Sequence, residues 1–343
     1  MISRSTGLAS LEYFENLIKL SFYTLFGGWM KVIDLFAGAG GFSRGFKEEG
    51  FEIVAAVENF PPKAKTYQIN FPETFVFVED IKRLDAEKLK KEIGEVEVII
   101  GGPPCEPFTA INLKRKENPL DRLYNDPIGR LVLHFIRFLK AFKPAIFVME
   151  EVPQVMEGPL REALQKEFKK AGYEVYFNIL DAYDYRTPQI RKRVFISNVP
   201  LNPPKVREKL TVWDAIGDLP DPRFSEKEIP NHEYVPLSAK KRRAIAKLGW
   251  GEALHSFGGR FKNWIRLHPY KPAPTVRGTS RFIHPFEDRL LTVREQARLM
   301  GYPDYHIFLG GRNVQYDSVG ESVPPTVARA IAEVVKEMLK KTP

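Results

Sequence analysis

Short apolar runs alternate with amphipathic stretches between residues 31 and 199. The apolar, β-rich runs predict strands at 32–36, 53–57, 74–78, 96–100, 145–149, 173–180 and 194–197. Amphipathic stretches between them predict helices at 42–49, 85–93 and 129–142. Strands that alternate with helices favour a mostly parallel sheet covered on both faces. The sequence therefore predicts a Rossmann-like α/β fold, in which ligands bind beyond the carboxyl ends of the strands.

The pattern changes near residue 200. Residues 200–285 are rich in Pro, Lys, Arg and His and have weak periodicity, which predicts a smaller domain with little regular structure. Regular spacing then returns, because Thr292 and Glu295 form a capping-box sequence that opens a helix. Pro324 and Pro325 open a last helix, whose predicted apolar face carries Val327, Ile331, Val334 and Met338. The predicted organisation is a catalytic domain at 30–199, the smaller domain at 200–285, a hinge and helix at 286–313, and a returning segment at 314–343.

Residues 1–29 precede this pattern and are predicted to be a dispensable extension. Residues 17–29 are apolar and aromatic but contain Lys19, and no small-residue cleavage site follows them. Met30 stands directly before the first predicted strand. The alternative is an ordinary helix packed on the domain. No run of apolar residues is long enough to span a membrane.

Charge and cysteine content narrow the function. The 343 residues carry 52 Lys and Arg against 43 Asp and Glu, a net charge of +9. This excess fits a polyanionic partner, although a solvated basic surface explains it nearly as well. Cys105 is the single cysteine, which excludes an intrachain disulfide framework and a multi-cysteine zinc site. A lone cysteine is usually a small buried hydrophobe, so its neighbours decide its role.

A glycine-rich turn follows the first predicted strand and precedes a helix. Residues 34–43 read Asp-Leu-Phe-Ala-Gly-Ala-Gly-Gly-Phe-Ser, and glycines there let the backbone approach a ligand. A dinucleotide fingerprint would need glycine in place of Ser43. Glu58 ends the second strand, where an acid can bind ribose hydroxyls, and Asp80 ends the third. The alternatives are a tight turn without a ligand and a nicotinamide dehydrogenase, which would explain neither Cys105 nor the basic segment.

Cys105 leaves the carboxyl end of the fourth predicted strand. Pro103 and Pro104 stiffen the backbone just before it, and a long polar and basic loop follows to about residue 127. Structureless loops of this length are usually functional lids or disordered. A buried structural thiol would not normally stand between prolines at the root of such a loop. This position favours a nucleophile over an inert thiol.

Charged residues also mark the ends of two later strands. Glu150 and Glu151 end the fifth strand, where two carboxylates are costly if they are buried and unpaired. They are either a solvated strand end or an acid pointing into the cleft beside Cys105. Arg191 and Arg193 alternate into the last strand and share one face. Such a pair suits a phosphate or can fix Glu150; the alternative is a solvated basic strand.

Together and in this order, these segments resemble the prokaryotic cytosine-C5 DNA methyltransferases over about residues 30–339. The individual motifs are weak, but the ordered set is specific. The motifs are Phe36-Ala37-Gly38-Ala39-Gly40-Gly41, Pro103-Pro104-Cys105, Glu150 before Val152, Gln189-x-Arg191-x-Arg193, Arg289-x-Leu291-Thr292-x-Arg294-Glu295 and Gly320-x-x-Val323-Pro324-Pro325.

The resemblance assigns roles to individual residues. Those expected to bind S-adenosylmethionine are Phe36, Ala37, Gly38, Gly40, Gly41, Glu58, Asn59, Asp80 and Ile81. Cys105 would be the nucleophile and Glu150 the acid at cytosine N3, with Arg193 on the O2 side and Arg191 beside it. Residues 200–285 would be the target-recognition domain, which ends near Thr275; Arg277 and Arg281 are the candidate DNA contacts.

The implied activity is methyl transfer from S-adenosylmethionine to carbon 5 of a flipped-out cytosine in a specific duplex sequence. The reaction would pass through a covalent bond between Cys105 and C6. No metal is expected. The implied setting is a cytoplasmic monomer acting on double-stranded DNA, with a cognate restriction endonuclease as an independent partner.

Glu106, Glu151 and Glu321 depart from the resemblance, because each stands where the family usually has an amide. Each adds a carboxylate near phosphates, the acid or the cofactor, which bears on rate and cofactor affinity. They leave open a non-catalytic DNA-binding relative. A transfer RNA cytosine methyltransferase is the other alternative, but its Cys-Phe-Thr signature is not found.

Overall fold

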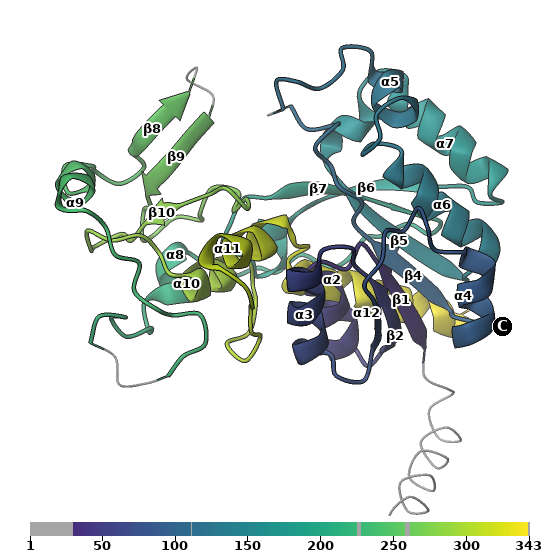
Figure 1. Ribbon diagram of the computed structural model, residues 1–343, viewed down its shortest axis with the longest axis horizontal. Coiled ribbons are helices and arrows are strands. Elements are labelled where there is room, and N and C mark those ends of the chain that lie inside the picture. Colours follow the sequence, from purple (N-terminus) through teal and green to yellow (C-terminus); the bar gives the residue numbers. More distant parts are fainter. Residues whose placement is uncertain (1–29, 111, 225–227, 258–260, 342–343) are drawn as a thin grey trace, which may run out of the picture.

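The computed structural model describes residues 30–110, 112–224, 228–257 and 261–341. Figure 1 shows two lobes: a larger one built around a twisted sheet, and a smaller one that carries a short sheet and several helices. The prediction that residues 1–29 are a dispensable extension lies outside the described residues. The two lobes are linked by chain segments that cross between them more than once.

The large sheet has seven strands in the order β3-β2-β1-β4-β5-β7-β6. The first five of these are parallel, whereas β7 is antiparallel to both β5 and β6. This confirms the predicted mostly parallel sheet. The strands are β1 (Lys31–Leu35), β2 (Glu52–Val57), β3 (Phe75–Phe77), β4 (Val98–Gly101), β5 (Ile146–Glu151), β6 (Tyr176–Asp181) and β7 (Lys192–Ser197).

Helices cover both faces of this sheet, because strands of a parallel sheet are apolar on both sides. One face packs against α2 (Gly41–Glu48) and α12 (Pro325–Lys341). The other packs against α4 (Ala86–Ile93), α6 (Leu131–Phe142) and α7 (Leu160–Lys170). Gly45 lets α2 and α12 approach closely, since a Cβ there would lie 2.3 Å from the backbone nitrogen of Arg329. The C-terminal helix therefore packs against the first part of the fold.

Two helices of the larger lobe escaped prediction, as did a short helix in the loop after Cys105. They are α3 (Pro61–Asn70) and α7 in the lobe, and α5 (Pro119–Tyr124) in the loop. The loop is also less open than its basic composition suggests. Arg122 is buried and donates hydrogen bonds to the carbonyls of Lys116 and Glu117, at 2.7 and 3.1 Å. Part of the basic charge there thus stabilises the loop itself.

The smaller lobe has more regular structure than its sequence pattern predicts. Its strands form a sheet in the order β10-β9-β8. Its elements are α8 (Val212–Ile216), α9 (Ala239–Ile245), β8 (Ala253–Phe257), β9 (Phe261–Arg266), β10 (Phe282–Ile283), α10 (Val293–Leu299) and α11 (Arg312–Glu321). One apolar core joins residues from Val212 to Val319. Residues on both sides of position 285 share this core. The predicted boundary of the smaller domain at residue 285 therefore stays a prediction.

The capping box at the start of α10 is confirmed. Thr292 Oγ1 accepts from the Glu295 amide at 3.2 Å, and the Thr292 amide donates to Glu295 Oε2 at 2.7 Å. Glu295 is buried, and both of its oxygens also accept from Arg289 at 2.8 Å. Because this carboxylate is fully paired, α10 begins at a fixed place within the smaller lobe.

Candidate active site

A cavity of about 880 Å³ opens at the carboxyl ends of the parallel strands. It lies where an α/β sheet is expected to bind its ligands. The predicted site residues that line it are Phe36, Gly38, Glu58, Asn59, Asp80, Ile81, Cys105, Glu150, Arg191, Arg193, Thr275 and Arg277. Ala37, Gly40, Gly41 and Arg281 were also predicted, but they do not line this cavity. Segments from both lobes thus contribute to one site.

The glycine-rich turn places a backbone amide against Glu58. The Gly38 amide donates to Glu58 Oε2 at 2.9 Å, and the Phe60 amide donates to Oε1 at 2.8 Å. Gly38 has φ of 55°, a left-handed conformation that favours glycine. Glu58 is therefore fixed at the end of β2, and each of its oxygens retains capacity to accept a further hydrogen bond.

The next two glycines serve packing within the protein. A Cβ on Gly40 would lie 2.4 Å from the ring of Phe71, and one on Gly41 would lie 2.3 Å from the Val323 carbonyl oxygen. The requirement for glycine there comes from the approach of α3 and of the C-terminal segment. The sequence pattern did not separate these glycines from Gly38.

Three buried polar side chains form a row of hydrogen bonds beneath the glycine-rich turn. Ser43 Oγ donates to Asp34 Oδ2 at 2.6 Å, and the hydroxyls of Ser43 and Tyr67 are also 2.6 Å apart. Burial raises the pKa of Asp34 to about 7, although its hydrogen bonds to Ser43 lower it. Asp34 therefore changes charge near neutral pH directly behind the site.

Cys105 stands at the start of the loop after β4, and its carbonyl oxygen accepts from the amides of Phe108 and Thr109 at 2.9 and 3.1 Å. Burial raises the pKa of its thiol to about 12, and the nearby acids Glu151 and Glu150 add to this effect when they are ionised. Arg193 acts in the opposite direction. The thiol is protonated at neutral pH in this state, so its ionisation needs additional stabilisation.

Glu150 and Arg193 form an ion pair at the floor of the cavity, with 2.9 Å between Arg193 Nε and Glu150 Oε1. Glu150 is only 8% exposed, and a paired charge is much less costly there than an isolated one. This contact follows the predicted arrangement in which an arginine fixes the acid. It holds the carboxylate beside Cys105.

Arg191 binds backbone carbonyls, whereas Arg193 binds the Glu150 carboxylate. Its guanidinium donates to the carbonyls of Val276, Ser322 and Gly320, at 2.8, 2.9 and 3.2 Å. Burial lowers its pKa to about 9. Arg191 thus ties β7 to the smaller lobe and to the C-terminal segment.

A second ion pair at this cavity escaped sequence reasoning. Lys63 Nζ lies 2.5 Å from Glu321 Oε2, and both residues line the cavity. Although burial opposes it, the carboxylate of Glu321 raises the pKa of Lys63. Glu321 was recognised as a departure from the family pattern. Its partner was missed because α3, which carries Lys63, was not predicted.

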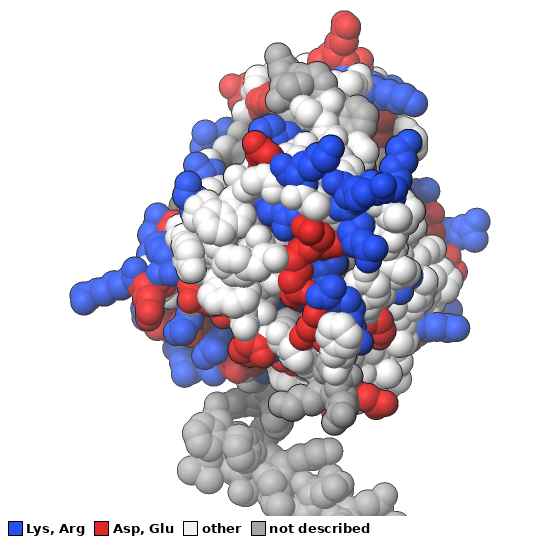
Figure 2. All heavy atoms as spheres, turned by 90° about the vertical axis from the view of Figure 1, so that its left-hand side faces the viewer, with Lys and Arg blue, Asp and Glu red and all other residues white. Residues whose placement is uncertain are grey.

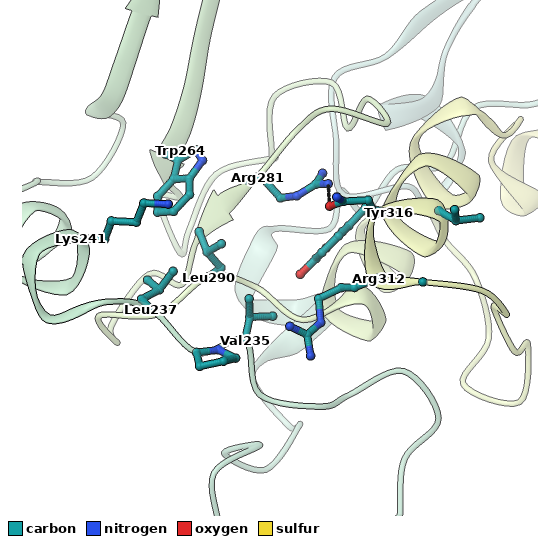
Figure 3. Close-up of a pocket in the computed structure, with 12 residues that line it drawn as sticks. Val235, Leu237, Lys241, Trp264, Arg281, Leu290, Arg312 and Tyr316 are labelled. Atoms are coloured by element: carbon teal, nitrogen blue, oxygen red, sulfur yellow. Dashed lines mark hydrogen bonds between the residues drawn. The ribbon is translucent and has the colours of Figure 1, made fainter.

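A second cavity, of about 500 Å³, lies within the smaller lobe beside the start of α11 (Figure 3). Lys241, Arg281 and Arg312 line it beside Trp264 and Tyr316. The Arg281 guanidinium stacks on the Tyr316 ring at 4.1 Å, and it donates to the Gly278 and Ser280 carbonyls and to Asn313 Oδ1. Arg281 therefore connects its own turn to α11.

Neither a metal site nor a membrane span is found in the described ranges. Residues 30–110, 112–224, 228–257 and 261–341 contain no group of three or more His, Cys, Asp or Glu side chains that could hold an ion. No helix within these ranges is long and apolar enough to cross a bilayer.

Comparisons with known proteins identify the family. Residues 30–337 match the family described as C-5 cytosine-specific DNA methylase. The chain is 53% identical over 321 residues to "Putative type II methyltransferase M.MJ0563P" of Methanocaldococcus jannaschii, which covers 90% of this chain and 100% of the relative. It is 36% identical over 357 residues to type II methyltransferase M1.HphI of Haemophilus parahaemolyticus, with 96% and 94% covered.

Solved structures agree with this result. A "putative DNA modification methyltransferase" encoded within an E. coli prophage aligns with a TM-score of 0.75 at 26% identity, covering 91% of this chain and 100% of that one. The chain therefore belongs to the C-5 cytosine-specific DNA methylases. The predicted family, α/β fold and enzyme class are confirmed.

Replacing Asp34 with Asn should change how stability depends on pH. The folded state favours the protonated form of Asp34. The contribution of this preference to the free energy of unfolding is complete below the pKa that Asp34 has in the unfolded chain, and it is lost as the pH rises through about 7. The stability of the wild type relative to Asp34→Asn should fall between about pH 4 and about pH 7, by a few kcal/mol in total. Urea unfolding at several pH values measures this difference.

The exposed substitution Glu174→Gln on the larger lobe is the control for the loss of one carboxylate. A constant difference between Asp34→Asn and the wild type would contradict the assignment of the titration to Asp34.

Proposed function

We propose that this enzyme transfers a methyl group from S-adenosylmethionine to carbon 5 of a flipped-out cytosine in a specific duplex DNA sequence. Cys105 is the nucleophile in this proposal. One observation carries it: Cys105, the Glu150–Arg193 ion pair and the Gly38–Glu58 turn all open onto the same cavity. Membership of the family supports the same reaction.

The residues of the cavity fit the proposed cofactor. Glu58 has remaining acceptor capacity for ribose hydroxyls, with Asn59 beside it, and Asp80 and Ile81 line the wall where an adenine would lie. The Lys63–Glu321 pair offers one charge of each sign, which suits the ammonium and carboxylate of an amino-acid group. When bound, S-adenosylmethionine supplies an electrophilic methyl group and a positive sulfonium charge.

The chemistry of the proposal depends on Cys105 and Glu150. Cys105 loses its proton and adds through sulfur to C6, which makes C5 nucleophilic toward the methyl group. Glu150 accepts a hydrogen bond from the exocyclic amine and, when it carries a proton, donates one to N3, which stabilises the negative charge that develops on the ring. Arg193 holds the Glu150 carboxylate in place. After the C5 proton is removed, the bond between Cys105 and C6 breaks and the thiolate is restored.

A stacked base cannot reach this cavity, so the cytosine must be extruded from the duplex at a cost of a few kcal/mol. The loop after Cys105 is the element that would close over it. We assign target recognition to residues 200–285, with Thr275 and Arg277 at the cavity and Arg281 at the second one. The outer face of the smaller lobe carries a mixture of basic and acidic side chains (Figure 2).

The relatives named as type II methyltransferases suggest the biological setting. We propose that the enzyme works as a cytoplasmic monomer on double-stranded DNA. A separate restriction endonuclease that reads the same sequence would complete a restriction–modification pair.

Replacing Cys105 with Ser should abolish methyl transfer while DNA binding survives. Serine keeps the shape but is a far weaker nucleophile at C6, since its hydroxyl ionises much less readily than a thiol. Transfer of a radiolabelled methyl group to duplex DNA measures activity, and a mobility shift measures binding. A serine variant with full activity would show that Cys105 does not carry the reaction.

Replacing Arg277 with Ala should weaken DNA binding, since this side chain lines the cavity beside Thr275. A lost phosphate contact should lower the salt slope of binding by about one unit for every sequence. A lost base contact should instead relax one position of the methylated site, by roughly 1–3 kcal/mol. Salt titrations and bisulfite sequencing separate the two outcomes.

Lys169→Ala provides a control for charge, because this exposed lysine lies on α7 of the larger lobe. The assignment of recognition to the smaller lobe would fail if exchanging residues 200–285 with those of a related enzyme left the methylated sequence unchanged.

A further inference from the structure

Glu151 is a fully buried carboxyl group at the end of the strand that also carries Glu150. It is the last residue of β5, and its neighbours Glu150 and Val152 both line the cavity. Glu151 itself is fully buried, because alternate residues of a strand point to opposite faces. It follows Phe147 and Met149 along the face that packs in the core under α6 and α7, and Cys105 packs against the same core. Glu151 and Cys105 are therefore near enough for their charges to interact, although Glu151 points to the opposite face of the strand from Glu150.

Only one oxygen of Glu151 has a partner. Its Oε2 accepts from the Val152 amide at 3.0 Å. Its Oε1 is buried and has no hydrogen-bond partner among the residues that the structure describes. An ionised carboxylate would thus be a largely uncompensated buried charge, which is costly.

The surroundings of Glu151 favour its neutral form. Burial raises its pKa well above the usual range, and the carboxylates of Glu150 and Glu106 act in the same direction. The Val152 amide and Arg193 oppose this shift. A neutral carboxyl group has one O–H donor, and the unpartnered Oε1 is the atom free to carry it.

We propose that Glu151 is a positioning residue that stays protonated and directs its carboxyl O–H toward the sulfur of Cys105 when the thiol ionises. This inference rests on the proposed function, in which the Cys105 thiolate is the reacting species. The Glu151 proton remains on its oxygen, and the proton of Cys105 is transferred to solvent. A hydrogen bond to a charged group is worth roughly 1.5–3 kcal/mol.

The protonation state of Glu151 then decides the sign of its effect. A neutral Glu151 stabilises the thiolate through a hydrogen bond, whereas an ionised Glu151 raises the cost of a second negative charge nearby. The other charged groups that face Cys105 are Glu150 on β5, Arg191 just before β7, Arg193 on β7, and Glu106 in its own loop. Substitutions at Glu151 leave these other charged groups unchanged.

The test uses the single cysteine of the chain, so that alkylation by iodoacetamide reports on Cys105 alone. The rate is measured against pH for the full-length wild type, Glu151→Gln and Glu151→Leu. Leucine removes the donor and should lower the rate at neutral pH by on the order of tenfold to a hundredfold. Glutamine retains an N–H donor and should restore the neutral-pH rate.

Two outcomes would overturn the proposal. If Glu151 is ionised at neutral pH, glutamine and leucine will both accelerate alkylation. If Glu151 is merely structural, the profiles of all three proteins will coincide. Should the leucine variant fail to fold, Glu151→Met is a second variant without a donor, and the same comparisons apply.

These outcomes are independent of the proposed function, because alkylation is measured on the enzyme without DNA. A methylating Cys105→Ser variant would refute the role of Cys105 and leave the alkylation result intact. Single-turnover methyl transfer should fall in Glu151→Leu and recover substantially in Glu151→Gln, while the Kd for DNA stays the same in both.

Discussion

The antiparallel insertion of β7 between β5 and β6 is the constraint on which the site depends. Its register pairs Phe195 with Glu150, and so brings Arg193 to the acid at the end of β5. A nearly buried carboxylate at that position needs a partner to remain charged. Arg191 immediately precedes this strand, and its guanidinium donates to carbonyls of the smaller lobe and the C-terminal segment. One strand, with the residue before it, therefore fixes the acid and joins both lobes around it.

The three carboxylates that depart from the family pattern have different surroundings. Glu106 is exposed at the cavity and can remain hydrated. Glu321 is paired with Lys63, so its charge is balanced at the proposed cofactor site. Glu151 is fully buried with one unpartnered oxygen, which favours the neutral acid. A count of added negative charges therefore overstates the change in the electrostatics of the site.

Periodicity predicted the strands well because β1, β4 and β5 are buried on both faces and read as continuous apolar runs. It missed α3, whose residues show little segregation of apolar and polar positions. The Lys63–Glu321 contact spans 258 residues, and no local pattern predicts such a pair. Spacing placed Arg191 and Arg193 on one face, but it could not distinguish the arginine that binds carbonyls from the one that binds Glu150.

The central claim, covalent attack by Cys105 on C6, is tested most directly by trapping the adduct. Duplex DNA in which 5-fluorocytosine replaces the target cytosine cannot lose a proton from C5, so the covalent intermediate should persist in the presence of S-adenosylmethionine. The account predicts a stable protein–DNA complex under denaturing conditions, with mass spectrometry locating the nucleotide on the peptide that contains Cys105. An adduct at another residue, or methyl transfer with no adduct to this DNA, would contradict it.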